Sequence, residues 1–235
     1  MKKITYLLSI LLLIACNTAP KHPIENKEEV QAIKKLPKTL QEGIEAHGGL
    51  KNWQSMKQMK YQFPKGDGFE EQIIDLQNRK VLINYDTYKV GFDGDDVWVS
   101  PNKDAFGKRS ARFYHNLIFY FYAMPFVLAD DGIVYTDMGK KTIQGNEYDG
   151  IKISYNDGVG DAPDDYYIAL FNDENIMEWL MYTVTYYSKE KSEKYNILNY
   201  SDWEEVNGLL LPKTMKGYKY ENDELGELRY ERTFS

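Results

Sequence analysis

Cysteine and histidine are scarce in this sequence, and their scarcity limits the chemistry that it supports. One cysteine among 235 residues excludes an internal disulfide. The three histidines, His22, His47 and His115, are far apart and form no His-x-His or His-Glu-x-x-His pattern. A Gly-x-Ser-x-Gly nucleophile turn is also missing. We therefore expect a protein that is not an enzyme, with no catalytic residue, no metal site and no cofactor.

Basic residues are outnumbered, and no apolar run is long enough to cross a bilayer. The chain has 29 Lys and Arg against 36 Asp and Glu, a net charge of −7, which argues against a nucleic-acid partner. The two most apolar runs, Ile4–Ala15 and Arg112–Phe126, are shorter than the roughly 20 residues that a membrane helix needs. The composition, 43% hydrophobic and 28% charged, is that of a folded domain.

The N-terminal residues have the features of a secretory signal. Lys2 and Lys3 precede the apolar run, which ends at Cys16. The sequence Leu13-Ile14-Ala15-Cys16 resembles the lipobox of bacterial lipoproteins, in which cleavage leaves the cysteine first and lipid-modified, for instance with palmitate. The alternative is an accidental cysteine in a plain signal peptide. We interpret Cys16 as the site of lipid attachment.

The residues after Cys16 indicate a location and a domain organisation. The residue after Cys16 is Asn17 and not Asp, which is similar to enterobacterial lipoproteins that are not retained in the inner membrane. We therefore expect the protein to lie at the periplasmic face of the outer membrane. The polar segment that follows contains two prolines and few large apolar residues. We therefore expect a signal peptide at 1–15, a flexible tether at 16–35 and a single domain at 36–235.

Beyond residue 36 the pattern predicts a short helix and then many strands. Leu40, Ile44 and His47 share one helical face, Gly48-Gly49 is a natural stop, and a second short turn follows at Leu50–Ser55. Short segments rich in β-branched and aromatic residues, separated by Gly, Asp and Asn, then dominate. Ten or so such strands in succession favour an antiparallel meander.

Two aromatic segments interrupt this simple pattern. In "MEWLMYTVTYY" both alternating sets are apolar, with Trp179 and Met181 on one face and Leu180 and Tyr182 on the other, so the strand is covered on both faces. The spacing in "RFYHNLIFYFYAMPF" predicts a helix over 112–124, ended by the following proline. A helix that is apolar on nearly every side must be buried, and we place it against the concave face of the sheet.

Three stretches resemble those of a known family. They are "EAHGGLKNW" (45–53), "DDYYIALFNDENIMEWLMYTV" (164–184) and "YSDWEEVNGLLLPKTMKGY" (200–218), in which Asp202-Trp203, Val206, Gly208 and Pro212 are the most specific. With the lipoprotein signal and the aromatic helix, they resemble the outer-membrane lipoprotein carrier and receptor (LolA/LolB-like) superfamily. More closely, they are similar to uncharacterised Gram-negative lipoproteins of that fold. The resemblance covers nearly the whole of 36–235, but the buried basic residue and protruding loop of the carriers are not identifiable.

The resemblance implies a mainly β fold with a few helices. The expected architecture is a curved antiparallel meander, an incomplete β-barrel of about 10–11 strands with helices on its concave side. In such proteins the half-barrel encloses an apolar cavity for acyl chains. The partners implied are a lipid or lipoprotein acyl chain, the membrane through the anchor, and an envelope protein.

The aromatic helix and the doubly apolar strand form the best candidate site. Six residues are the candidates for apolar ligand binding: Phe119, Phe121, Tyr122, Phe126, Trp179 and Tyr182. One alternative is a non-catalytic envelope interaction module with a filled core. A weaker one is an enzyme on lipid or glycan, based on the acidic loop that contains Asp157, Asp161, Asp164 and Asp165. That loop does not match the EF-hand pattern, and a solvated inter-strand loop is the simpler interpretation.

Overall fold

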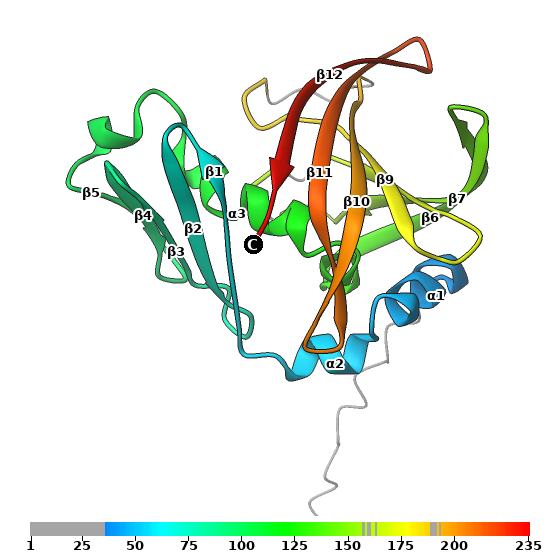
Figure 1. Cartoon of the computed structure of the whole chain (residues 1–235), viewed down its shortest axis with the longest axis horizontal. Helices are drawn as coiled ribbons and strands as arrows, with labels where there is room; N and C mark the ends of the chain where they lie inside the picture. Colours follow the sequence, from blue (N-terminus) through cyan, green and yellow to red (C-terminus); the bar gives the residue numbers. More distant parts are fainter. Residues whose placement is uncertain (1–35, 157, 159–160, 163, 189–191, 193) are drawn as a thin grey trace, which may run out of the picture. The chain divides into compact units, whose positions relative to one another are not determined.

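Alternation of apolar and polar residues produces two antiparallel sheets in the computed structural model (Figure 1). The structure describes residues 36–156, 158, 161–162, 164–188, 192 and 194–235, within one compact unit, Leu36–Ser235. The first sheet has the order β1-β2-β3-β4-β5 and the second β12-β11-β10-β9-β8-β7-β6. The strands are β1 Gln58–Lys65, β2 Gly68–Asp75, β3 Val81–Tyr85, β4 Tyr88–Phe92, β5 Val97–Ser100, β6 Ile133–Ile143, β7 Asn146–Tyr155, β8 Tyr167–Phe171, β9 Met177–Tyr182, β10 Asn196–Val206, β11 Leu209–Glu221 and β12 Glu224–Thr233.

The predicted mainly β fold is confirmed, with strands that follow one another as an antiparallel meander. The sheets do not close into a barrel. They meet where Ser235 exchanges backbone hydrogen bonds of 2.9 and 3.0 Å with Gln62 of β1. The described residues contain twelve strands, one or two more than predicted, in sheets of five and seven. The meander is interrupted because the helical segments between 103 and 129 separate β5 from β6.

Five short helical segments accompany the strands in the described part of the chain: α1 Lys38–Ala46, α2 Leu50–Ser55, η1 Lys103–Phe106, α3 Ala111–Tyr122 and η2 Phe126–Ala129. The predicted face of α1 is buried, since Leu40, Ile44 and His47 are at most 1% exposed. Gly48 follows α1 with a φ of 109°, a value that stops a helix and that glycine adopts readily. The second short turn, Leu50–Ser55, is present as α2.

The aromatic segment forms α3, which lies between the two sheets (Figure 1). Ser110 accepts a hydrogen bond of 3.1 Å from the backbone nitrogen of Phe113 and so caps the helix. The helix ends at Tyr122, ahead of the proline, and of its 12 residues only Arg112 is exposed. The prediction of nearly all-round burial is confirmed. Among the described residues no helix is both long enough and apolar enough to cross a bilayer.

Strand β9 is covered on both faces, as predicted. Leu180 and Tyr182 face the main core, which also contains the buried side of α3. Trp179 and Met181 belong to a second group, which we call the outer cluster and which comprises Ile143, Tyr148, Ile168, Leu170, Trp179, Met181 and Ile197. The tips of the β6–β7 and β11–β12 hairpins bend toward each other over this side of the sheet (Figure 1). There Lys141 Nζ lies 3.5 Å from Asp223 Oδ1.

The predicted signal peptide, the lipid attachment site Cys16 and the predicted tether at 16–35 lie outside the described residues. One residue of the acidic loop, Asp157, also lies outside them. These parts of the sequence interpretation remain predictions.

Candidate functional site

Two of the stretches that carry the family resemblance are in direct contact. The backbone nitrogen of Leu210 donates a hydrogen bond of 2.8 Å to the carbonyl of His47. Asn52 Nδ2 donates to the carbonyls of Asn207 and Gly208 at 3.2 and 3.0 Å. Asn207 and Gly208 have φ values of 53° and 75°, which are those of a two-residue hairpin turn between β10 and β11. The α1–α2 segment therefore holds the tip of this hairpin in place.

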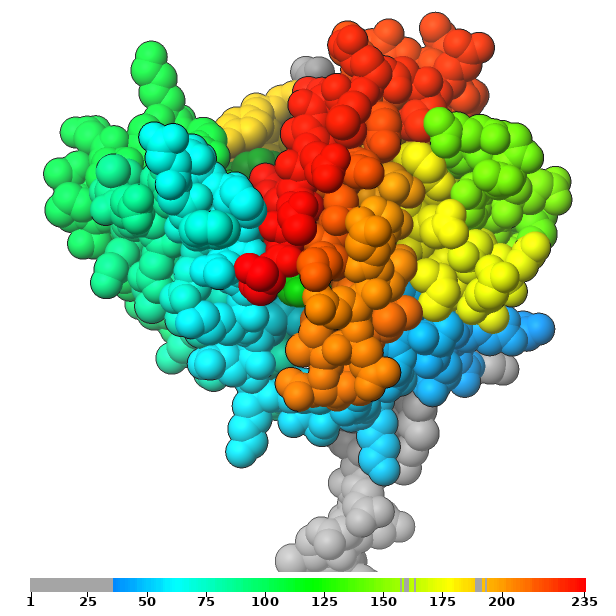
Figure 2. All heavy atoms as spheres, viewed as in Figure 1, coloured from blue at the N-terminus to red at the C-terminus, as the bar shows by residue number. Residues whose placement is uncertain are grey.

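A groove lies between β1 of the first sheet and the β10–β11 hairpin of the second, and we call it the intersheet groove. Its volume is about 350 Å³. Its apolar lining consists of Trp53, Met56, Met59, Leu76, Tyr122, Val206, Leu209, Leu211, Pro212 and Phe234. In the space-filling view, green mid-chain atoms are visible between the cyan β1–β2 surface and the orange β10–β11 surface (Figure 2). Because Tyr122 of α3 is among its lining residues, the groove reaches the end of that helix.

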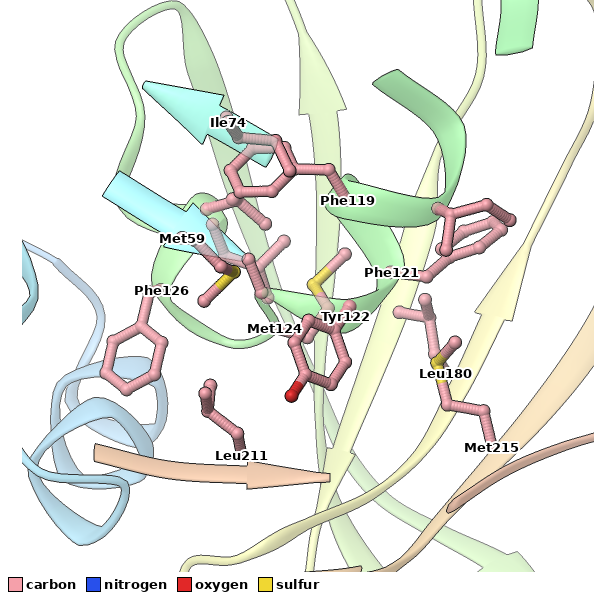
Figure 3. Close-up of a cluster of buried hydrophobic side chains, with 14 of the residues drawn as sticks. Met59, Ile74, Phe119, Phe121, Tyr122, Met124, Phe126, Leu180, Leu211 and Met215 are labelled. Atoms are coloured by element: carbon pink, nitrogen blue, oxygen red, sulfur yellow. The ribbon is translucent and has the colours of Figure 1, made fainter. Parts of the chain in front are cut away.

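Tyr122, the last residue of α3, forms the floor of the intersheet groove. Its ring stacks on Phe234 at 4.4 Å between centroids and lies 4.5 Å from the ring of Tyr61. In the close-up, Tyr122 extends toward Leu211, whereas Phe119 and Phe121 leave the helix on other sides (Figure 3). Burial, together with the charge of Glu204, raises the pKa of the Tyr122 hydroxyl to about 12. The floor is therefore uncharged at neutral pH.

The rim of the groove is polar and carries charges of both signs. Gln58, Lys60, Glu204, Asn207, Lys213 and Ser235 contribute to it. Lys213 Nζ lies 3.6 Å from Glu204 Oε2, and Lys60 Nζ lies 2.6 Å from Glu71 Oε2. An apolar floor with a polar rim suits an amphipathic ligand, whose chain enters while its head group remains in water.

A buried polar network holds α3 against the first sheet. Glu70 of β2 is 0% exposed. Its Oε2 accepts hydrogen bonds from Lys65 and, at 2.6 Å, from the Tyr88 hydroxyl. Its Oε1 accepts from the Tyr114 hydroxyl of α3 and from Gln72 Nε2, each at 2.7 Å. All the strong acceptor positions of this carboxylate are thus used within the protein.

The electrostatics of the network favour a charged pair. Burial acts to raise the pKa of the Glu70 carboxyl, but the hydrogen bonds from Lys65, Tyr88 and Tyr114 and the charge of Lys65 outweigh it. The pKa of Glu70 therefore lies below its ordinary value. Burial lowers the pKa of Lys65, against the opposing effect of Glu70. The network fixes Tyr114, and through α3 it fixes Tyr122, the floor of the groove.

A second cavity, of about 280 Å³, lies along the outer side of α3, and we call it the helix groove. Phe113, Leu117, Tyr120 and Phe121 of the helix line it. Opposite them are side chains from β7, β8 and the adjoining loops, namely Tyr155, Tyr167, Tyr186, Asp161 and Asp165. Four carboxylates border this cavity, since Asp130 and Asp131 also reach it, so an anionic head group bound there would be repelled.

The six predicted ligand-binding residues do not form one site. Tyr122 lines the intersheet groove and Phe121 lines the helix groove. Phe121 and Tyr182 face each other at 4.8 Å between ring centroids. The three remaining residues lie apart, with Phe119 and Phe126 completely buried at 0% exposure and Trp179 in the outer cluster.

Sequence reasoning missed most residues of the intersheet groove. Met59 of β1 and Leu211 of β11 are more than 150 positions apart in the printed numbering, and both line the groove. The alternation in "MKQMKYQF" indicated a strand with one buried face, and the run of three leucines in "NGLLLP" indicated only a buried segment. No local signal indicated that the two strands would come together.

His47 and two residues of the acidic loop, Asp161 and Asp165, make contacts that stabilise the fold. His47 Nδ1 lies 2.7 Å from the carbonyl of Gly43, as expected for a residue at the helix end, and burial lowers the pKa of His47 to about 4. Asp161 pairs with Arg112, and Asp165 Oδ1 accepts from the backbone nitrogen of Thr185 at 2.6 Å. Within the part of the chain that the structure describes, no three His, Cys, Asp or Glu side chains are grouped to hold a metal ion.

Comparison with known proteins gives similarity of structure only. No protein-family model matches the sequence, and no curated protein is similar to it in sequence. The structure is similar to a LolA superfamily protein from Nitrosomonas europaea, with 10% identity over 76% of this chain and 82% of the other and a TM-score of 0.47. It is also similar to a DUF1329 family protein from Desulfovibrio piger, with 12% identity over 84% and 91% of the two chains and a TM-score of 0.49.

A third solved structure is an outer membrane lipoprotein-sorting protein domain from Vibrio parahaemolyticus. It shares 10% identity over 80% of this chain and 89% of the other, with a TM-score of 0.39. The superfamily that the sequence resembles is thus also named among the structural neighbours. Because all three TM-scores are below 0.5, no role is transferred from these proteins to this chain.

Proposed function

We propose that this protein binds an acyl chain of a lipid or lipoprotein in the intersheet groove, without catalysis. The observation that carries the proposal is the shared apolar lining: Met59 from the first sheet, Leu211 from the second and Trp53 from α2 border one open space. The volume of about 350 Å³ falls within the range of about 300–1,000 Å³ that is typical of ligand sites. Burying each methylene group gains about 0.8 kcal/mol, so about eight of them gain roughly 6 kcal/mol before the costs of association.

The proposal assigns the ligand to the groove rather than to the interior around α3. Phe119, Met124 and Phe126 are each 0% exposed, so protein side chains already fill that interior. Inserting an acyl chain there would require displacing large side chains from a packed core, whereas the groove is open. The ligand would therefore lie in front of Tyr122, with its head group at the polar rim.

The sequence signals support a membrane location for this activity. We propose that lipidated Cys16 anchors the protein to the periplasmic face of the outer membrane and that residues 16–35 tether the domain. Because the net charge is −7, attraction to anionic lipid would not hold the protein there, so the lipid anchor must do so.

Uptake of a fluorescent fatty acid by a soluble form, residues 17–235, tests the proposal. A matched pair of exposed strand valines serves as perturbation and control: Val206, 42% exposed at the groove, and Val134, 45% exposed on β6. Val206→Trp should cover the groove and weaken uptake at least fivefold, while Val134→Trp should leave it unchanged. Native mass spectrometry of the same protein should find a copurifying lipid.

Failure of the wild-type protein to take up the probe or to carry lipid would overturn the proposal. The filled core around α3 would then favour the alternative, a non-catalytic interaction module whose rim contacts an envelope protein.

A further inference from the structure

A separate cavity, of about 800 Å³, lies on the other face of the second sheet, and we call it the basic pocket. Pairs of residues on neighbouring strands identify this face. Lys152 of β7 is paired with Ile168 of β8, and Ile197 of β10 is paired with Tyr218 of β11. Paired residues of antiparallel strands point to the same side. Since Ile168 and Ile197 belong to the outer cluster, Lys152 and Tyr218, which line the pocket, stand on that side as well. The basic pocket has no lining residue in common with the intersheet groove.

Basic side chains outnumber carboxylates in the lining of the basic pocket. Lys152, Lys194, Lys219 and Arg229 line it, together with the carboxylates Glu221 and Asp223. Asp223 pairs with Lys141, which lies outside the pocket lining, at 3.5 Å. Lys219 pairs with Glu227 at 2.5 Å, whereas the Arg229 side chain donates a hydrogen bond to the neutral Asn196 Oδ1 at 3.3 Å. Among the described residues, no carboxylate forms an ion pair with the side chain of Lys152, Lys194 or Arg229. In a protein of net charge −7 such a group is unusual and offers a local binding site for an anion.

Tyrosine rings form the walls between these cations. The ring of Tyr166 lies under the Lys152 ammonium group at 4.0 Å and 6.0 Å from the ring of Tyr195. The Tyr166 hydroxyl donates to the carbonyl of Ser192 at 2.7 Å, which fixes the ring in position. Tyr218 stands on the buried Trp179, with 6.0 Å between centroids. These rings provide preorganised flat surfaces beside the positive charges.

We propose that the basic pocket binds a phosphorylated sugar. The phosphate would accept charge-assisted hydrogen bonds from Lys152 and Arg229. The apolar face of the sugar ring would lie on a tyrosine ring, and its hydroxyls would meet Asn196 and the other polar side chains. A purely apolar ligand would leave the cations desolvated and unpaired, at a high cost. A mono- or disaccharide suits a cavity of about 800 Å³.

Calorimetric titration of the full chain with glucose 6-phosphate tests the proposal, with glucose and inorganic phosphate as comparison ligands. We expect the phosphosugar to bind at least tenfold more tightly than either comparison ligand. Lys152→Gln and Arg229→Gln should each weaken it about tenfold, the effect of losing one charged hydrogen bond. Lys89→Gln is the matched control, because Lys89 is an exposed strand lysine of β4 outside the pocket.

The phosphosugar could be free in solution or part of a lipid head group, and the same variants test both sources. In a second arm, phosphatidylcholine vesicles with and without lipid A are sedimented with the protein, so that the phosphosugar is presented on a lipid. Binding in either arm that Lys152→Gln and Arg229→Gln weaken, and Lys89→Gln does not, supports the site and identifies the source. No binding in either arm, or binding that the two pocket variants leave unchanged, would overturn the proposal. Neither result depends on fatty-acid uptake by the intersheet groove.

Discussion

Replacing Glu70 by glutamine should destabilise the protein far more than replacing its neighbour Glu71. Glu70 is completely buried and accepts from Lys65, Tyr88, Tyr114 and Gln72. A glutamine keeps the shape but removes the charge and presents an NH₂ group to one pair of donors. Breaking a buried ion pair costs about 3–5 kcal/mol. Because the Lys65 side chain is 22% exposed and can turn toward water, we expect the lower value, about 3 kcal/mol.

Thermal unfolding followed by circular dichroism measures this loss. For a chain of this length each kcal/mol lowers Tm by about 2–4 °C, so Glu70→Gln should lower Tm by about 6–12 °C. Glu71→Gln is the matched control, since Glu71 pairs at 2.6 Å with a Lys60 side chain that is 60% exposed. Loss of such a surface pair costs at most about 1 kcal/mol.

The effect of pH follows from the sign of the pKa shift. The pKa of Glu70 is lower in the folded protein than its ordinary value, so its contribution to stability is fully present above the ordinary glutamate pKa. That contribution is lost as the pH falls through the lower, folded pKa. The Tm difference between wild type and Glu70→Gln should therefore shrink on acidification below about pH 4. Equal destabilisation by the Glu70 and Glu71 variants at pH 7 would refute this account of the network.

Three further predictions concern the core, a backbone contact and the anchor. Phe126→Ala should lower the free energy of unfolding, measured by chemical denaturation, by about 3–5 kcal/mol, because the ring is 0% exposed. Phe121 borders the helix groove, so the loss for Phe121→Ala should be smaller by at least about 1 kcal/mol. Gly48→Ala should lower the free energy of unfolding by about 2 kcal/mol or more, because the added Cβ would lie 2.1 Å from a backbone oxygen of the β10–β11 turn. Gly107→Ala is the control and should lower it less, because Gly107 also has a positive φ but has no neighbour within 4 Å of the added Cβ. Cys16→Ser should release the protein from the membrane fraction without changing its Tm, and a variant that stays tightly bound after its signal peptide is cleaved would contradict the lipoprotein interpretation.

Local patterns predicted local structure. The helical face of Leu40, Ile44 and His47 and the helix stop at Gly48-Gly49 depend on a few consecutive residues, and both are present. The burial of α3 was also predictable, because a helix with apolar residues on nearly every side has no face that water can cover favourably.

Tertiary contacts were not predictable in the same way. In β2 the polar Glu70 is buried while Phe69 is 55% exposed, the reverse of the usual preference. The reason is that Glu70 faces Tyr114 of α3 and Tyr88 of β4, two residues distant in sequence, whose hydroxyls satisfy the carboxylate. The candidate site also combined Trp179 with Tyr182, although residues three apart on a strand point to opposite faces. The structure accordingly separates these two side chains into the outer cluster and the main core.

Photo-crosslinking with a diazirine-bearing fatty acid tests the central claim, acyl-chain binding in the intersheet groove, most directly. After irradiation, digestion and mass spectrometry locate the labelled residues. The account predicts labels on two peptides distant in sequence, around Met56–Met59 and around Leu209–Pro212, which together line the groove. It also predicts that excess unlabelled palmitate removes both labels. Labels confined to the helix groove, at Phe113–Phe121, or no labels that palmitate displaces, would contradict it.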